Sequence, residues 1–201
     1  MCIIDSTISG EVHCSSAYRS AAQEAKLGVL GVWYTIMRLD HSYIFFGTAA
    51  LLHRRFKSHI AQNALRARCE RTKMIILDMA SVDAMDSTAG SIFVKAQRLA
   101  RSKGITLVWA GLEPRVEAEL LRSGVALCVA SDAKKTPLLA NLDRTAKTSF
   151  ANLDKAEKWV EDRLLEHVHR LAARWLVDKT CLLYTSPSPR DRTRSRMPSS
   201  A

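Results

Sequence analysis

Residues 74–90 constrain the fold more than any other stretch, because they join a short apolar run to an amphipathic helix through a turn rich in Asp and Ser. Residues 74–77 are four apolar residues with no polar alternation, which is typical of a strand covered on both faces in a parallel sheet. After the turn, apolar residues recur with helical spacing, at Ala89, Ile92, Phe93, Ala96, Leu99 and Ala100. The sequence therefore predicts a helix over 87–103, ended by Gly104 and capped at its start by Asp86 or Ser87.

The rest of the chain repeats this alternation of strand and helix. We expect strands at 32–39, 43–46 and 106–109, and helices at 48–68, 114–123 and 152–177 with a cap at Asn152. The strand at 43–46 follows the turn at 40–42 and is expected to be a hairpin partner of the first strand. Residues 126–129 could form a short last strand, and 131–150 are expected to form a loop. The pattern predicts an α/β fold, with a mixed sheet of about 4 to 5 strands flanked by about 4 helices.

Length and composition agree with one domain. A chain of 201 residues, 47% hydrophobic and 25% charged, can bury one substantial core but not two. We expect a lead-in over residues 1–30, the domain over 31–177, and a disordered basic tail over 178–201. No apolar run approaches the length of a membrane span, and acidic residues interrupt the first dozen positions, so neither a span nor a secretory signal is expected.

The tail has its own composition. Residues 181–201 carry three of the five prolines and a net charge of +3, which suits a disordered segment. The string also resembles a translated read-through of a sequencing adapter, so we exclude it from the fold reasoning. The alternative is a basic tail that binds RNA or acidic lipid.

No motif indicates an enzyme. The sequence has no Gly-x-x-x-x-Gly-Lys, Gly-x-Gly-x-x-Gly, Gly-x-Ser-x-Gly or His-Glu-x-x-His pattern. Its five cysteines are widely spaced and odd in number, which favours reduced thiols over disulfides or a zinc site. We therefore expect no catalytic residue, no metal and no cofactor.

Three acidic residues, Asp78, Asp83 and Asp86, gather after the buried strand, where α/β sheets often bind ligands. They could hold Mg²⁺, or Asp78 could accept a phosphoryl group as in a receiver domain. However, the paired acids and the later Lys of a receiver are not evident. Asp83 and Asp86 are interpreted more simply as turn and cap residues that support the turn.

A second cluster is basic. Without the tail, residues 1–180 carry a net charge of +7. Arg54, Arg55 and Lys57 lie on the helix over 48–68, and we interpret them either as a solvated face or as a contact for anionic lipid or an acidic partner. Nucleic acid is not expected, because no recognition motif accompanies the charge. The helix is expected to pack through a ridge of Leu52, Phe56, Ile60 and Ala64.

The buried strand, the Asp86-Ser87-Thr88 turn and the helix after it resemble the STAS family, the sulfate-transporter and anti-sigma-factor-antagonist domain. The resemblance covers roughly residues 12–177. Segments 39–49, with its Phe-Phe-Gly-Thr-Ala motif, 104–112 and 152–165 resemble the STAS domains attached to SulP-type anion permeases. A STAS-like sheet flanked by helices is implied.

The resemblance implies a cytosolic regulatory domain at the carboxyl end of a sulfate or related anion permease, on the cytoplasmic face of a membrane. Its partners would be the transporter's membrane domain or a second STAS copy, while the chain itself would be soluble. In stand-alone antagonists the Ser of this turn is phosphorylated, which carries that role to Ser87 with Thr88 adjacent. Ala89 replaces the Gly usual in the antagonists, which favours ordinary capping. The alternative is a free-standing antagonist-like signalling protein switched at Ser87.

Overall fold

The computed structural model describes residues 4–127 and 147–184. The chain divides into two compact units, Met1–Leu165 and Glu166–Ala201. The first unit contains both sheets, helices α1 to α4 and the beginning of α5 (Leu153–Tyr184). The second unit contains the remainder of α5.

A five-stranded mixed sheet forms the centre of the first unit. Its order is β1 (Ile4–Ser9), β2 (Tyr34–Leu39), β4 (Met74–Asp78), β6 (Thr106–Ala110) and β7 (Ser149–Phe150). β1 runs antiparallel to β2, and the other neighbours are parallel. All five residues of β4 are buried, which confirms the prediction of a strand covered on both faces.

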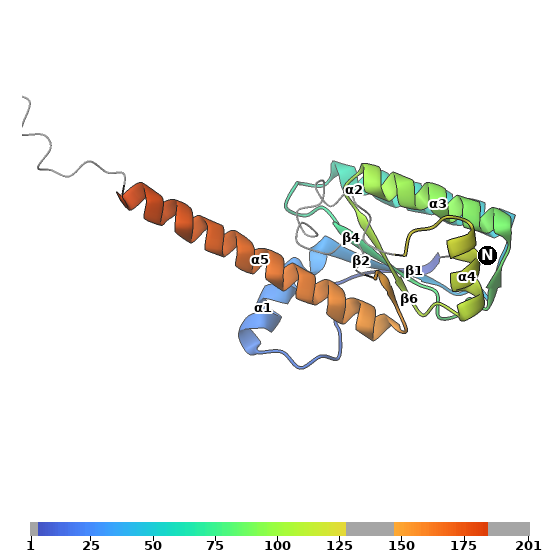
Figure 1. Cartoon of the computed structure of the whole chain (residues 1–201), viewed down its shortest axis with the longest axis horizontal. Coiled ribbons are helices and arrows are strands. Elements are labelled where there is room, and N and C mark those ends of the chain that lie inside the picture. Colours follow the sequence, from blue (N-terminus) through green and yellow to red (C-terminus); the bar gives the residue numbers. More distant parts are fainter. Residues whose placement is uncertain (1–3, 128–146, 185–201) are drawn as a thin grey trace, which may run out of the picture. The chain divides into compact units, whose positions relative to one another are not determined.

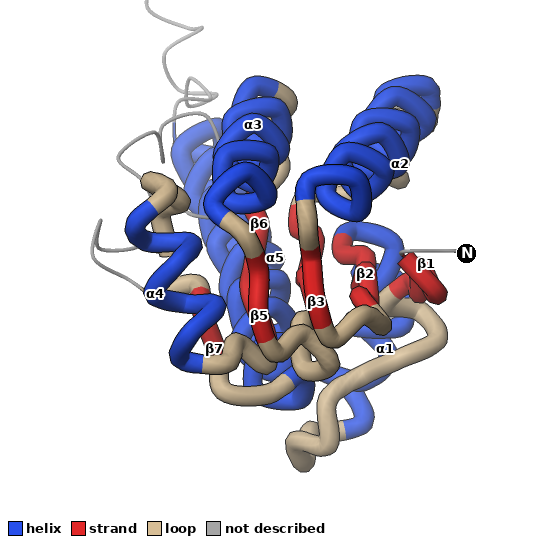
Figure 2. Tube along the Cα trace, turned by 90° about the vertical axis from the view of Figure 1, so that its right-hand side faces the viewer, coloured by secondary structure: helices blue, strands red, loops and turns tan. Residues whose placement is uncertain are grey.

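Helices cover the sheet on both sides. α2 (Phe46–Leu65) and α3 (Ser87–Ser102) lie side by side on one face (Figures 1 and 2). Their core residues pack with those of α4 (Pro114–Arg122) and with Trp109, whose ring meets Phe93 edge-on at 5.7 Å between centroids. α1 (Ala21–Leu30) and the first turns of α5 lie on the opposite face. The predicted α/β fold is confirmed, with five helices in the described part of the chain.

The predicted hairpin is wrong. β3 (Tyr43–Ile44) pairs in parallel with β5 (Ala84–Met85) in a separate two-stranded sheet. Both edges of β2 are already occupied, by β1 and β4, so no edge is left for β3. The small sheet lies where α2 and α3 begin, and it brings the start of one helix beside the start of the other.

Residues 1–30, expected to be a lead-in, contain both β1 and α1. The 3₁₀ turn Gly31–Trp33 takes the first residues of the predicted strand at 32–39. α2 also begins and ends earlier than the predicted 48–68, whereas α3, β6 and α4 agree with prediction to within one residue at each end.

Between β1 and α1, the chain is anchored to the start of α5 by two buried carboxylates. Glu157 and Glu161 are each 1% exposed. His13 Nδ1 lies 2.6 Å from a Glu157 oxygen, and Ser15 donates its N–H and hydroxyl to Glu161. Arg19 pairs with Glu161 at 2.8 Å. Desolvation, only partly offset by His13, raises the pKa of Glu157 above its ordinary value.

The last part of the chain differs from expectation in two places. Residues 126 and 127 are not a strand, and the rest of that prediction, with most of the loop at 131–150, lies outside the described residues. The cap at Asn152 is confirmed, since its side-chain oxygen accepts the Lys155 N–H at 3.0 Å. α5 continues to Tyr184, so residues 178–184 of the predicted tail are helical. Residues 185–201 lie outside the described part.

Candidate functional site

The Asp86 carboxylate joins the first turns of two helices. Asp86 is the N-cap of α3, and one of its oxygens accepts the Ala89 N–H at 2.6 Å. The other oxygen accepts the N–H of Phe46, the first residue of α2, at 3.1 Å. The Asp86 N–H donates to the carbonyl of Ile44 in β3. One side chain therefore fixes where α2, α3 and the small sheet meet.

Electrostatics at this junction favour the ionised carboxylate. Desolvation opposes the charge on Asp86, but hydrogen bonds from Ala89, Thr88 and Phe46 outweigh it, so the pKa of Asp86 lies below its ordinary value. Unpaired N–H groups and the dipoles at two helix starts act in the same direction.

Ser87 and Thr88 are both exposed in the first turn of α3, but they are not equivalent. The Thr88 side chain hydrogen-bonds to Asp86 and so belongs to the cap. The Ser87 hydroxyl makes no hydrogen bond within the described part of the chain. Of the two predicted phosphoacceptors, Ser87 is thus the one whose hydroxyl is available to a partner.

The other two acids of the predicted cluster do not converge with Asp86. Asp78 is buried at the end of β4, where it pairs with Arg38 at 3.1 Å and accepts the Ala80 N–H. Asp83 is exposed, and its backbone N–H donates to Ser42. No group of three His, Cys, Asp or Glu residues in the described ranges is arranged to hold a metal ion. Cys14 and Cys69 are free thiols on the surface.

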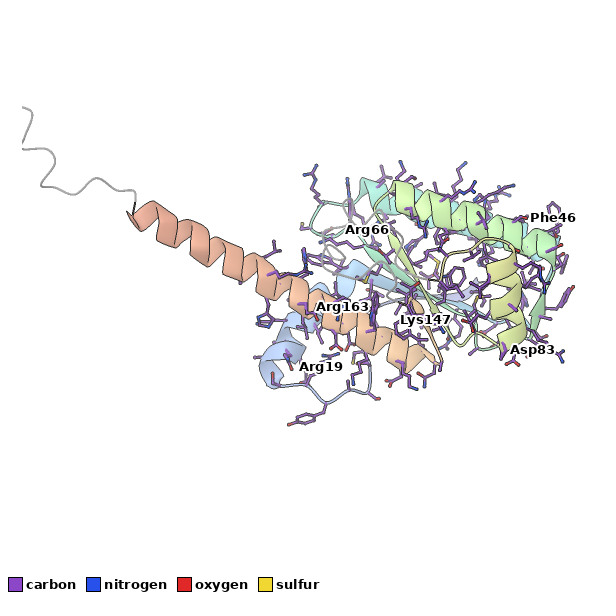
Figure 3. All side chains as sticks on the ribbon, in the orientation of Figure 1. Arg19, Phe46, Arg66, Asp83, Lys147 and Arg163 are labelled. Carbon is purple, nitrogen blue, oxygen red and sulfur yellow. The ribbon has the colours of Figure 1, made fainter. Side chains whose placement is uncertain are left out.

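Large apolar side chains surround this junction, and the motif search missed them. Tyr43, Phe45, Phe46 and Leu51 are 53%, 54%, 63% and 50% exposed. Figure 3 shows Phe46 at the same end of the first unit as Asp83. The sequence holds a signal for this patch, since two consecutive Phe residues precede the α2 core ridge without belonging to it. We call Tyr43, Phe45, Phe46, Leu51 and Ser87 the turn surface.

The predicted basic residues Arg54, Arg55 and Lys57 are exposed on α2, whose buried ridge includes Leu52, Phe56 and Ile60 as expected. Ala64 is exposed, however, and the ridge ends instead at Asn63. Its amide exchanges two hydrogen bonds with the backbone of Thr72.

Neighbouring α3 adds two exposed cations, Lys95 and Arg98, which the sequence reasoning did not connect with α2. Neither α2 nor α3 contains an Asp or Glu.

A profile described as STAS domain matches residues 26–136, more than half of the chain. The chain belongs to the STAS domain family. STAS domains are typically non-catalytic, which agrees with a site built from a capped turn and exposed apolar side chains.

Solved structures with a similar fold include two transporter proteins and RsbS. A sulfate transporter family protein from Wolinella succinogenes is 21% identical over 66% of this chain and 88% of its own, with a TM-score of 0.44. The murine Slc26a9 anion transporter is 13% identical over 65% of this chain, with a TM-score of 0.46, and the match spans 18% of its length. RsbS from Moorella thermoacetica is 16% identical over 67% of this chain and 92% of its own, with a TM-score of 0.43. A search of curated proteins finds no match.

Among the described helices, none combines the length and the apolar character that crossing a bilayer requires.

Proposed function

We propose that this STAS domain is the cytosolic regulatory and protein-interaction domain of a sulfate or related anion transporter, where it modulates transport and assembly at the cytoplasmic face of the membrane. Its partner is the transporter's membrane domain or a second STAS copy. The sequence resemblance of residues 39–49, 104–112 and 152–165 to SulP permeases supports the transporter context. The turn surface is the observation that carries the proposal.

The turn surface suits protein contact because its apolar side chains are exposed around a junction fixed by hydrogen bonds. Phe46 opens α2 and its backbone is hydrogen-bonded to Asp86, so its position is coupled to that of Ser87 in α3. Clustered exposed aromatic residues of this kind mark interaction sites more often than solvated surface. A partner seated here would contact both helix starts at once.

The alternative is a free-standing, antagonist-like signalling protein switched by phosphorylation at Ser87. The exposed Ser87 hydroxyl favours it. A phosphate at the start of α3 would meet favourable N–H groups, yet it would place a dianion beside Phe46 and change the contact surface. Ala89 in place of Gly favours the transporter context.

We further propose that the basic face of α2 and α3 lies toward an anionic membrane surface. Arg54, Arg55 and Lys57 on α2, with Lys95 and Arg98 on α3, project from two neighbouring helices that carry no acid. Each such cation near an anionic bilayer contributes on the order of 1 kcal/mol to attraction.

A paired substitution tests the turn surface. The double change Phe45→Ser and Phe46→Ser should abolish co-purification with the membrane domain encoded upstream, or self-association measured by light scattering, because it removes exposed apolar area without removing core volume. Val29→Ser is the matched control, since Val29 is 75% exposed on α1. Equal binding by all three proteins would refute the proposal. Hydrophobic spans in the reading frame upstream of Met1 would separate the transporter context from the free-standing alternative.

A further inference from the structure

A pocket of about 390 Å³ lies between α2 and the edge of the main sheet. Thr7 of β1 pairs with Met37 of β2 and lines the pocket with it, on the face of the sheet that α2 covers. Four residues of α2 and its C-cap, Arg66, supply the rest of the lining. Figure 3 shows Arg66, which follows the last residue of α2, at the opposite end of that helix from Phe46. The pocket is therefore separate from the turn surface.

The lining is polar and cationic. Three of the lining residues, Arg55, His59 and Gln62, follow one another at spacings of four and three residues, which places them on one stripe of α2. Arg66 lines the pocket from just beyond the end of the helix, and Ser58 lies beside the stripe. None of the described residues that line the pocket is acidic, and no Asp or Glu occurs between Asp40 and Glu70. The lining thus presents two guanidinium groups and several neutral donors to one cavity.

His59 gives an independent reason to expect a polar ligand in this cavity. Its Nε2 is buried and has no hydrogen-bond partner in the described part of the chain. A buried polar atom without a partner costs free energy, so native structures usually satisfy it. Burial, followed by the charge of Arg66, lowers the pKa of His59 below its ordinary value. Thr7 and Met37, which face it from the sheet, carry no charge.

We propose that this pocket binds an oxyanion of the phosphate or sulfate type, held by Arg55 and Arg66 and by a hydrogen bond from His59 Nε2. Guanidinium groups fit the paired oxygens of such anions, which a spherical halide lacks. Ser58, Gln62 and Thr7 can donate to the remaining oxygens. The inference concerns a second site and does not depend on the proposed transporter context.

The test is a titration of the whole chain with inorganic phosphate and with sulfate, at constant ionic strength in chloride. The readout is the His59 ring resonance in NMR spectra, assigned with a His59→Gln variant. We expect a saturable shift and a higher pKa for His59, because a bound anion stabilises the imidazolium. Arg55→Gln and Arg66→Gln should each weaken binding by about tenfold or more. Both side chains are exposed, so the variants should fold, which circular dichroism checks.

Arg54→Gln is the matched control, because Arg54 is adjacent to Arg55 and exposed but does not line the pocket. Vesicles of phosphatidylcholine with and without phosphatidic acid identify the source of the oxyanion. A response to free phosphate or sulfate, or to phosphatidic acid alone, supports the site if Arg55→Gln and Arg66→Gln remove it. No response to any of these, an equal response to chloride, or equal loss in Arg54→Gln would overturn it.

Discussion

Asp86 has the most connections of any residue in the turn. As the N-cap of α3 and a hydrogen-bond acceptor for α2, it serves two helices with one carboxylate. The sequence predicts the first of these roles, because an Asp before an apolar helical stripe is a cap signal. The second role depends on Phe46, forty positions earlier in the chain. Local patterns do not report such a tertiary contact.

Two substitutions at Asp86 separate these roles. Asp86→Asn keeps one acceptor oxygen and should cost less than about 1 kcal/mol of unfolding free energy, whereas Asp86→Ala loses both bonds and should cost about 2 kcal/mol. Urea denaturation measures both. The folded-state pKa lies below its ordinary value of 3.8, so the stabilisation is present above that pH and is lost as pH falls through the folded-state pKa. The deficit of Asp86→Asn should shrink below about pH 3.8; a deficit that stays constant in acid would contradict the charged cap.

Ser87 should tolerate substitution better than a capping residue. It is exposed and the cap is Asp86, so Ser87→Ala and Ser87→Asp should each stay within about 0.5 kcal/mol of the parent in urea denaturation. Ser87→Asp should nevertheless weaken binding of a partner to the turn surface, because it adds charge beside Phe46. Binding that is unchanged in a folded Ser87→Asp protein would leave Ser87 with a structural role alone.

At the scale of elements, the sequence was most informative where periodicity was strong. The run at 74–77 and the stripe of α3 predicted their elements closely, since burial on both faces and on one face leave different patterns. The predicted hairpin at 32–46 was wrong because the apolar pattern of two adjacent segments does not determine which strand each will pair with. β1 was missed because short edge strands have weak patterns, and four of its six residues are polar.

The basic face of α2 and α3 makes a prediction at this scale. Reversing Arg54, Arg55 and Lys57 to Glu should lower partitioning onto phosphatidylserine vesicles by at least about 100-fold at low salt, measured by co-sedimentation. The control is a triple reversal to Glu at Lys26, Lys155 and Lys158, which are exposed on α1 and α5. It changes the net charge by the same amount without altering the basic face. If the parent protein does not co-sediment with anionic vesicles, the basic face of α2 and α3 is only a solvated surface.

In the first unit as a whole, α5 anchors the N-terminal segment. The sequence alone does not predict this contact. Glu157 and Glu161 look like ordinary surface acids on a helix, and only the fold reveals that they are buried against residues 13–19. The three central strands, β2, β4 and β6, and helices α2 to α5 were predicted because apolar patterns are local. Buried ion pairs between distant segments are not.

Removing the counter-ion of Glu161 measures this anchor. Arg19→Met leaves a nearly fully buried carboxylate with hydrogen-bond donors from Ser15 and Tyr34 but without its cation, so it should cost about 2 to 3 kcal/mol of unfolding free energy. Arg122→Met is the control: Arg122 pairs with Glu119 while 74% exposed, so its loss should stay within about 0.5 kcal/mol. Thermal denaturation followed by circular dichroism compares them, and equal losses would contradict a buried anchor.

The same anchor orders events during synthesis. Its hydrogen bonds join residues 138 to 146 positions apart, so the first twenty residues leave the ribosome long before α5 exists to receive them. The parallel strands from β2 to β6 can assemble earlier, since their helical crossovers are already complete. In a nascent chain halted before Glu157, the α2–α3 layer could form, but the N-terminal segment would lack its binding partners on α5. Docking of the N-terminal segment onto α5 is therefore a late step in co-translational folding of the domain.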